Sequence, residues 1–155
     1  MNFNKNDLTI RKLRELNGDM GEVISDEISP LSVWYAGIQN IQLLNLDDGD
    51  VAKLIRQNLI LEFAIPESIR RLNQLPTAGK IYVGELMNSF NHIKCEFWTR
   101  NVICTKESCE FFKRLKSHPL LVHFQWELEE EKQDYFSDLK KMISTLEEVL
   151  KRIGG

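Results

Sequence analysis

Three histidines and three cysteines are the side chains of this sequence that could ligate a metal or form a nucleophile with its base. His92 and Cys95 are separated by two residues, which suits one half of a zinc site, whereas Cys104 and Cys109 are separated by four. A structural zinc ion needs four converging ligands, and one short pair supplies only part of them. A Cys-His enzyme would use the same residues, but no local signature distinguishes one thiol. We expect reduced, packed cysteines, with no metal, no cofactor and no catalytic centre.

The sequence also gives no indication that the chain binds nucleotides or nucleic acids. The chain has no G-x-x-x-x-G-K and no G-x-G-x-x-G motif, since Gly79-Lys80 lacks the preceding glycine. The densest basic cluster, Lys113, Arg114 and Lys116, has Glu107 and Glu110 beside it. Binding to phosphates would need a larger basic face, so we interpret this cluster as a solvated helix surface.

Carboxylates are concentrated in one stretch, the acidic segment of residues 15–50. It holds eight acidic residues and no lysine or arginine: Glu15, Asp19, Glu22, Asp26, Glu27, Asp47, Asp48 and Asp50. The formal net charge of the whole chain is only −3, so the rest of the sequence nearly balances this segment. Such asymmetry can attract a basic partner and speed its association. The alternative is a solvated surface whose charges have no specific role.

Two large aromatic residues, Trp34 and Tyr35, lie inside the acidic segment. Tryptophan and tyrosine are common at the centres of protein interfaces, where they fill pockets and exclude water. They are equally common in protein cores. The sequence leaves both interpretations open. Together with the carboxylates, they give the candidate binding residues Asp19, Glu22, Asp26, Glu27, Trp34, Tyr35, Asp47, Asp48 and Asp50.

Length and composition indicate one compact domain over residues 1–155. The chain is 43% hydrophobic, which is ordinary for a globular protein with a core. Its longest apolar runs are far shorter than the roughly 20 residues that a membrane helix needs. The amino-terminal residues lack the apolar stretch and cleavage site of a signal peptide. We therefore expect a cytoplasmic protein without membrane contact.

Apolar spacing predicts several helices. Val83, Leu86, Met87 and Phe90 fall at i, i+3, i+4 and i+7, which places them on one helix face. The same period runs from Tyr135 to Ile153. We interpret this last stripe as a core-facing surface, because it is too short for a coiled coil.

Capping residues predict where other helices begin. Asp47, Asp48 or Asp50 can cap a helix, which we expect to end at Pro66 or to be followed there by the next one. Ser29-Pro30 predicts another helix start. Asn6 or Asp7 is expected to cap a short helix that ends at Gly18.

Residues 93–128 are ambiguous. Apolar and polar residues alternate around Ile93–Phe97 and Val122–Leu128, which is the period of a half-buried strand. The competing interpretation makes residues 118–133 part of a long helix. The predicted fold is therefore predominantly α, a compact multi-helix domain with five or more helices and a possible minor β element within residues 93–128.

Part of the sequence resembles a known bacterial family. The run from Leu54 to Pro66, preceded by Asp50 and followed by Y-V-G-E-L at Tyr82–Leu86, is similar to that of contact-dependent growth inhibition immunity proteins. Phe97 with Trp98 matches a Phe-Trp pair, and Leu16–Glu22 matches a weaker segment that ends in Gly-Glu. The departures are Arg56 and Met20, where the family often has Gly and Trp, and residues 29–44, which replace a basic Cys-His segment.

The resemblance implies a non-enzymatic protein that binds and neutralises the toxic C-terminal domain of a cell-surface effector. Such toxins are frequently nucleases, and a nuclease needs a basic cleft. The acidic segment would complement that cleft, with cognate toxin as the partner and no nucleic acid or membrane involved. The alternative is a helical adaptor or regulator that uses the same acidic face for another protein.

Overall fold

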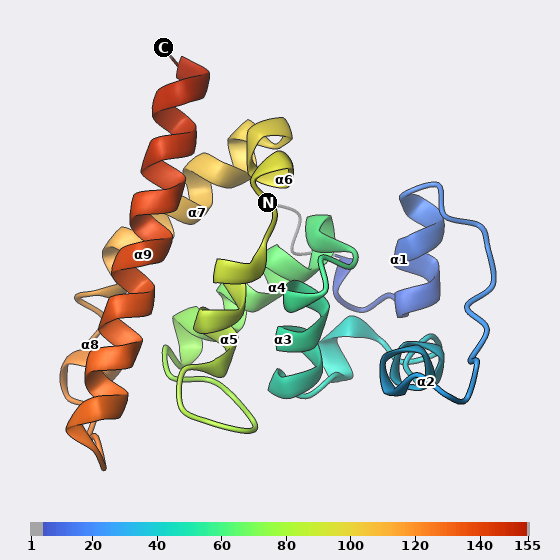
Figure 1. Ribbon diagram of the computed structural model, residues 1–155, viewed down its shortest axis with the longest axis horizontal. Helices are drawn as coiled ribbons and strands as arrows, with labels where there is room; N and C mark the ends of the chain where they lie inside the picture. Colours follow the sequence, from blue (N-terminus) through green and yellow to red (C-terminus); the bar gives the residue numbers. More distant parts are fainter. Residues whose placement is uncertain (1–4, 155) are drawn as a thin grey trace.

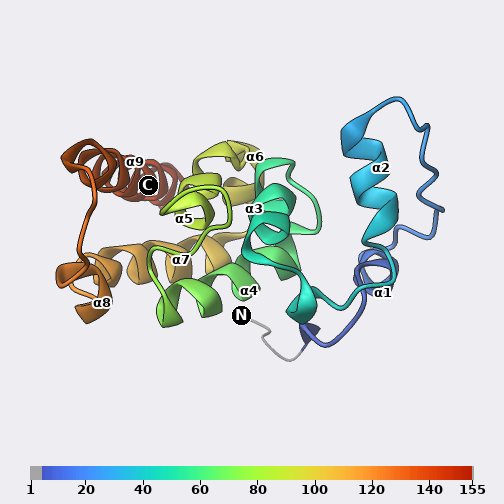
Figure 2. The same ribbon diagram turned by 90° about the horizontal axis from the view of Figure 1, so that it is seen from below.

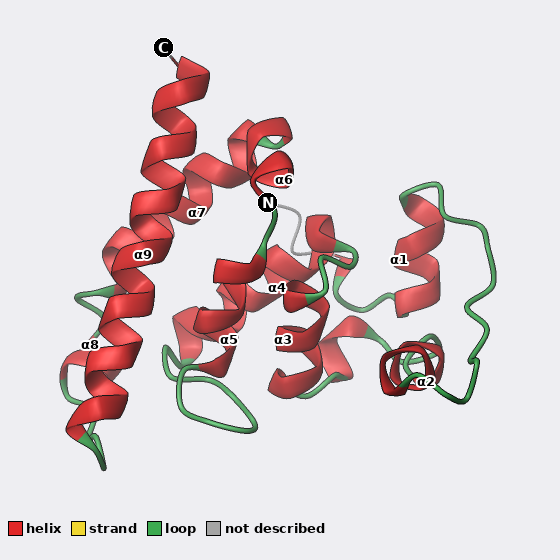
Figure 3. Ribbon diagram, viewed as in Figure 1, coloured by secondary structure: helices red, strands yellow, loops and turns green. Residues whose placement is uncertain are grey.

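Helices make up nearly all the regular structure of residues 5–154, which are the residues that the computed structural model describes (Figure 1, Figure 3). Two short 3-10 helices are η2 (Leu43–Asn45) and η3 (Phe90–His92). The prediction of a predominantly helical chain with five or more helices is confirmed. In this part of the chain the α-helices are α1 (Ile10–Leu16), α2 (Pro30–Gly37), α3 (Asp48–Arg56), α4 (Leu61–Gln74), α5 (Glu85–Ser89), α6 (Cys95–Arg100), α7 (Val102–Leu115), α8 (Pro119–Val122) and α9 (Glu129–Gly154).

The helices form an elongated arrangement with different elements at its two ends. Figures 1 and 2 show α9 at one end with α7 and α8 beside it, α3, α4 and α5 in the middle, and α1 and α2 at the other end. The long helix α9 packs against α5, α6 and α7, while α3 packs against α4 and α5. The helical stripe predicted from Tyr135 to Ile153 is buried as far as Val149, whereas Ile153 at its end is exposed. The buried members are Tyr135, Leu139, Met142, Ile143, Leu146 and Val149.

Local side-chain caps explain where three helices begin. The Ser29 side chain accepts a hydrogen bond from the Ser32 amide, and Pro30 occupies the first turn of α2. The Asp47 side chain caps α3 by accepting from the Asp50 amide. Both of these starts agree with the sequence predictions. The cap of α1 does not, because Thr9 performs this role in place of Asn6 or Asp7.

Pro66 lies inside α4, so the prediction that a helix ends or begins there was wrong. The chain turns earlier, at Ile60, whose φ of 42° is left-handed, and α4 starts at the next residue. The missing amide of Pro66 removes one helical hydrogen bond. Burial of the helix face that carries Ala64, Ile65, Ile69 and Leu72 offsets this loss.

The possible β element within residues 93–128 is not present in the described structure, where these residues form α6, α7, α8 and turns. The alternative of one long helix over 118–133 is also wrong, because α8 ends at Val122 and α9 begins at Glu129. A strand needs a neighbouring strand to satisfy its backbone. Instead, the alternating aromatic residues Phe124 and Trp126 pack edge-on, and Trp126 also packs against Tyr135.

A buried ion-pair network joins α4 to the start of α3 and to η2. Glu67, which is 2% exposed, accepts hydrogen bonds from Arg70, from Arg71 at 2.7 Å and from Asn6 at 3.0 Å. Arg71 also donates to Asp48 and to the carbonyls of Leu43 and Leu44. One guanidinium group of α4 therefore connects to η2 and to the start of α3, which lie 23 to 28 residues earlier in sequence.

The pKa of Glu67 reflects this environment. Burial alone would raise the pKa of the carboxyl group, but hydrogen bonds from Arg70, Asn6 and Arg71 and the charge of Arg71 lower it below the ordinary value of 4.5. The ionised carboxylate is therefore the form that the fold stabilises.

Replacing Glu67→Gln should lower the free energy of unfolding by about 3 kcal/mol, because the change leaves two guanidinium groups without their buried partner. Urea denaturation followed by circular dichroism measures this difference. The control is Glu148→Gln, which removes a partner of Arg152 on the exposed side of α9 and should change stability by less than about 0.5 kcal/mol. Equal effects of the two substitutions would contradict a structural role for the buried network.

Stability should also fall in acid because of Glu67. A lowered folded-state pKa means that the unfolded chain binds more protons, so this contribution is fully present above about pH 4.5 and is lost as the pH falls through the folded-state value. Urea midpoints measured between neutral pH and pH 3 test this for the parent and for Glu67→Gln. The variant should show a shallower decline, and identical pH profiles would contradict the assignment.

Candidate functional site

The first part of the acidic segment lies at one end of the molecule. Helices α1 and α2 and the loop between them stand apart from α7 and α9, and the loop follows the outer edge (Figure 1, Figure 2). We call residues 18–28 the acidic loop. Four candidate residues lie in it, namely Asp19, Glu22, Asp26 and Glu27.

Arg14 fixes the beginning of the acidic loop to both helices. Its buried guanidinium group donates to Asp19 at 3.1 Å, to the carbonyl of Gly21 at 2.5 Å and to Gln39 at 2.7 Å. Gln39 in turn donates to the carbonyl of Tyr35 in α2. The hydrogen bond from Arg14 lowers the pKa of Asp19, with the Gly21 amide adding to this effect. Asp19 is therefore a structural partner of Arg14 as well as a surface carboxylate.

Beyond Asp19 the loop exposes large apolar side chains between its carboxylates. Met20, Ile24 and Ile28 are 74%, 78% and 90% exposed. The carboxylates of Glu22 and Glu27 have no hydrogen-bond or ion-pair partner among the described residues. Alternating apolar and acidic groups that protrude in this way are typical of a surface that another molecule covers.

Asp26 and Glu27 shape the end of the loop. The Asp26 carboxylate accepts hydrogen bonds from the amides of Ile28 and Ser29, which precede α2. Glu27 has a positive φ of 61°, so the chain bends sharply at this residue. Asp26 therefore holds the turn, whereas the Glu27 side chain has no partner among the described residues.

Trp34 connects α2 to the body of the protein. Its half-buried indole donates to Asp50 at 2.8 Å, and the ammonium group of Lys53 lies 4.7 Å from the ring centre. The ring of Tyr35 stacks on Trp34 with centroids 5.9 Å apart. Burial raises the pKa of Tyr35. Both aromatic residues thus have intramolecular partners and also keep exposed surface.

The remaining carboxylates are largely neutralised within the chain. Asp47 accepts from the Lys80 ammonium group at 2.8 Å, which lowers the pKa of Asp47, and Asp48 pairs with Arg71 at 3.1 Å. The candidate residues therefore form two groups. Asp47, Asp48 and Asp50 lie at the start of α3 with basic or indole partners, whereas the acidic loop keeps unpaired charge.

Sequence reasoning missed the partners, because they lie outside the acidic segment. Lys80 is 33 residues from Asp47, and Arg71 is 23 residues from Asp48. No local pattern marks such pairs. Arg14 directly precedes the acidic segment, so the charges within the segment do not reveal that Asp19 has a basic partner.

A hollow of about 230 Å³ lies at the start of α3, beside Trp34. Its lining carries three carboxylates, Asp47, Asp50 and Glu85, and three bases, Lys53, Arg56 and Lys80. Glu85 is buried and accepts hydrogen bonds from the amides of Lys80 and Ile81, while Arg56 lies 3.5 Å away. The acidic residue of the Y-V-G-E-L motif thus fixes the loop that borders the hollow.

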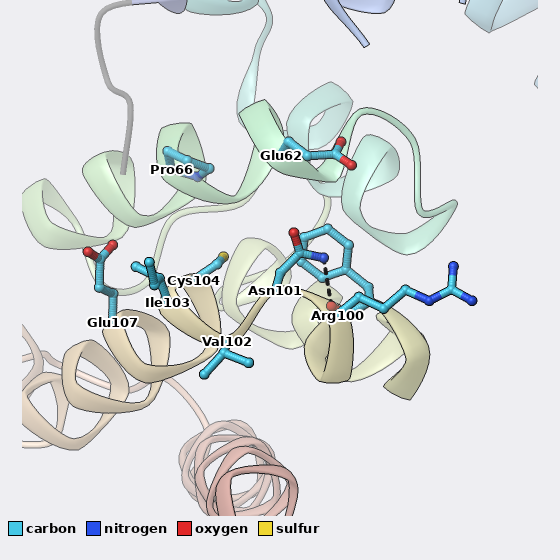
Figure 4. A pocket seen from close by; sticks show the side chains of 9 residues that line it. Glu62, Pro66, Arg100, Asn101, Val102, Ile103, Cys104 and Glu107 are labelled. Atoms are coloured by element: carbon cyan, nitrogen blue, oxygen red, sulfur yellow. Dashed lines mark hydrogen bonds between the residues drawn. The ribbon is translucent and has the colours of Figure 1, made fainter. Parts of the chain in front are cut away.

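A larger hollow of about 500 Å³ separates α4 from the junction of α6 and α7. Figure 4 shows Ile103 and Cys104 of α7 on the side that faces Pro66, with Glu62 and Glu107 at its margins. Burial raises the pKa of Cys104 to about 11, so the thiol is protonated at neutral pH and is a poor nucleophile. Within residues 5–154 no three His, Cys, Asp or Glu side chains are grouped as metal ligands would be.

Comparison with known proteins identifies the family. The family model described as CDI immunity proteins, where CDI is contact-dependent growth inhibition, matches residues 15–107. The chain belongs to this family. A search of curated proteins gave no match. The matched range includes the acidic loop and α2 to α6, but not α9.

Family membership confirms the resemblance expected from Asp50, Leu54–Pro66 and Tyr82–Leu86. It implies that this CDI immunity protein protects against a CDI toxin by binding it, and such proteins are generally not enzymes. In the described residues, no helix is both long and apolar enough to span a membrane.

Replacing Trp34→Phe should lower the free energy of unfolding by about 1 kcal/mol, because it removes the hydrogen bond to Asp50 but keeps an aromatic ring. Thermal and urea denaturation measure the change. Trp126→Phe is the control, since Trp126 is also half-buried but donates no hydrogen bond to the described protein residues. Equal destabilisation of the two variants would show that the bond to Asp50 contributes nothing.

Proposed function

We propose that this chain binds and neutralises the toxic C-terminal domain of a CDI effector, that the toxin is a basic nuclease, and that the acidic loop contacts it. Protection then takes place in the cytoplasm of the producing cell. The family match supports the partner class, and the unpaired carboxylates of the exposed loop support the place of contact.

The charge distribution is the reason for proposing the acidic loop, and not the start of α3, as the surface that contacts the toxin. At the start of α3, Lys80 and Arg71 already compensate Asp47 and Asp48, so a partner would have to break these pairs. In the acidic loop Glu22 and Glu27 have no such partners within residues 5–154 and are exposed. A nuclease holds its substrate through lysine and arginine side chains, and free carboxylates complement those groups directly.

The exposed apolar side chains supply the second part of the interaction. Met20, Ile24 and Ile28 occur at every fourth position and lie beside the acids of the loop. Burial of such side chains on a partner stabilises a complex by removing apolar surface from water. Inhibition is then steric and electrostatic: the loop occupies basic groups that the nucleic acid needs, and no reaction on the immunity protein is required.

The decisive binding experiment is capture of the cognate toxin domain. The purified chain, immobilised, should retain that domain and abolish its degradation of RNA or DNA at equimolar concentration. Failure to retain the domain would refute the proposed function. Retention of a toxin that degrades neither nucleic acid would refute the nuclease assignment alone.

Reversing the free charges, with Glu22→Lys and Glu27→Lys together, should slow association with the toxin by about ten-fold at low salt. The difference should shrink as salt increases, because ions screen charges beyond about 10 Å at 0.1 M ionic strength. Surface plasmon resonance at several salt concentrations measures this. The two side chains have no ion pair in the part of the chain that the structure describes, so stability should change little.

The matched control reverses two exposed acids elsewhere, Glu110→Lys on α7 and Glu127→Lys before α9. This variant has the same net charge as the first, so it separates a local effect from a general one. Equal slowing in both variants would show that only overall charge matters. Association of the Glu22 and Glu27 variant at the parental rate would place the contact surface elsewhere.

A further inference from the structure

The acidic loop carries a stretch of backbone whose amides are unpaired. The amides of Glu22, Val23, Ile24 and Ser25 have no hydrogen-bond partner among the described residues. Exposure alternates along the same stretch, since Glu22, Ile24 and Asp26 are exposed while Val23 and Ser25 are half-buried. A period of two residues is typical of a strand, so residues 22–26 have the exposure pattern of a strand that lacks a neighbour.

One edge of this stretch is covered by the protein itself. The hydroxyl group of Ser32 in α2 donates to the carbonyl of Ile24 and accepts from the amide of Asp26, at 3.3 and 3.2 Å. In a strand, the amide and carbonyl groups of residues i and i+2 point to the same side, and those of the residues between point to the other. The edge formed by Val23 and Ser25 is therefore the open one.

We propose that this open edge pairs with an exposed edge strand of the toxin domain, so that residues 22–26 extend the toxin's sheet. The inference rests on the proposed function, because it names how the same loop binds the same partner. Main-chain hydrogen bonds supply affinity in such strand addition, and the alternating side chains supply selectivity.

The side chains indicate which kind of strand fits. Glu22, Ile24 and Asp26 present an acid, an apolar group and an acid on one face. Opposite charges across neighbouring strands are stabilising. The partner strand therefore carries lysine or arginine on either side of an apolar residue, which agrees with a basic toxin.

The same charges argue against a second copy of this chain as the molecule that pairs with the open edge. If two copies paired through this edge in antiparallel register, Glu22 and Asp26 of each would lie close to those of the other. Like charges in that position destabilise pairing, and charged edges are a common protection against self-association. A basic strand of another protein meets no such barrier.

Two measurements with the isolated cognate toxin domain test the proposal. In the complex, hydrogen exchange followed by nuclear magnetic resonance should show the amides of Val23 and Ser25 protected by about ten-fold or more. Val23→Pro removes an amide of the open edge and should weaken binding by about ten-fold relative to Val23→Ala. The control pair is Glu22→Pro and Glu22→Ala, because the Glu22 amide lies on the other edge, and these two should bind equally.

The outcomes are distinguishable. If the toxin binds while both amides exchange as fast as in the free chain, strand pairing is refuted and the proposed function stands. If the unaltered chain does not bind the toxin, the proposed function itself fails. If the toxin-free chain is a dimer in which these amides are already protected, the occupant is a second copy and the proposal is wrong. The exchange measurement uses the unaltered chain, so it decides the matter even if a proline variant does not fold.

Discussion

Glu67 is a carboxylate inside the protein, and two guanidinium groups and an amide surround it. An isolated buried charge is strongly unfavourable, so its partners must occupy fixed places. Arg71 meets this need and at the same time satisfies two carbonyls of η2 and the Asp48 side chain. The start of α3, the turn before it and the middle of α4 thus share one polar centre. Helix α3 in turn supplies the two groups that contact Trp34. Asp50 accepts the hydrogen bond of the indole, and the ammonium group of Lys53 lies over the ring.

The exposed end of the molecule follows from this arrangement. Helix α2 is held through Trp34, and the beginning of the acidic loop is held through Arg14, but the amides of residues 22–25 in the middle of the loop have no hydrogen-bond partner among the described residues. A loop that is fixed at both ends and unpaired in its middle is well suited to binding another protein. The ends limit the entropy lost on binding, and the middle offers unpaired groups.

Much of the helical structure could be predicted from sequence because its causes are local. Ser29-Pro30 and Asp47 act within one turn, and the stripe that ends at Ile153 repeats with the helix period. The errors had non-local causes. Pro66 is tolerated because tertiary burial outweighs one lost hydrogen bond, and residues 122–128 alternate without finding a partner strand. The acidic segment looked uniform for the same reason, since Lys80 and Arg71 reach its carboxylates only in the folded chain.

Helix α9 lies outside the family match, yet it covers α5, α6 and α7 and buries six of its own side chains against them. It also follows all of these elements in the order of translation. A nascent chain therefore emerges from the ribosome with that side of its core uncovered and completes its packing only after α9 is free. Packing of the matched elements thus depends on a helix that lies outside the matched range.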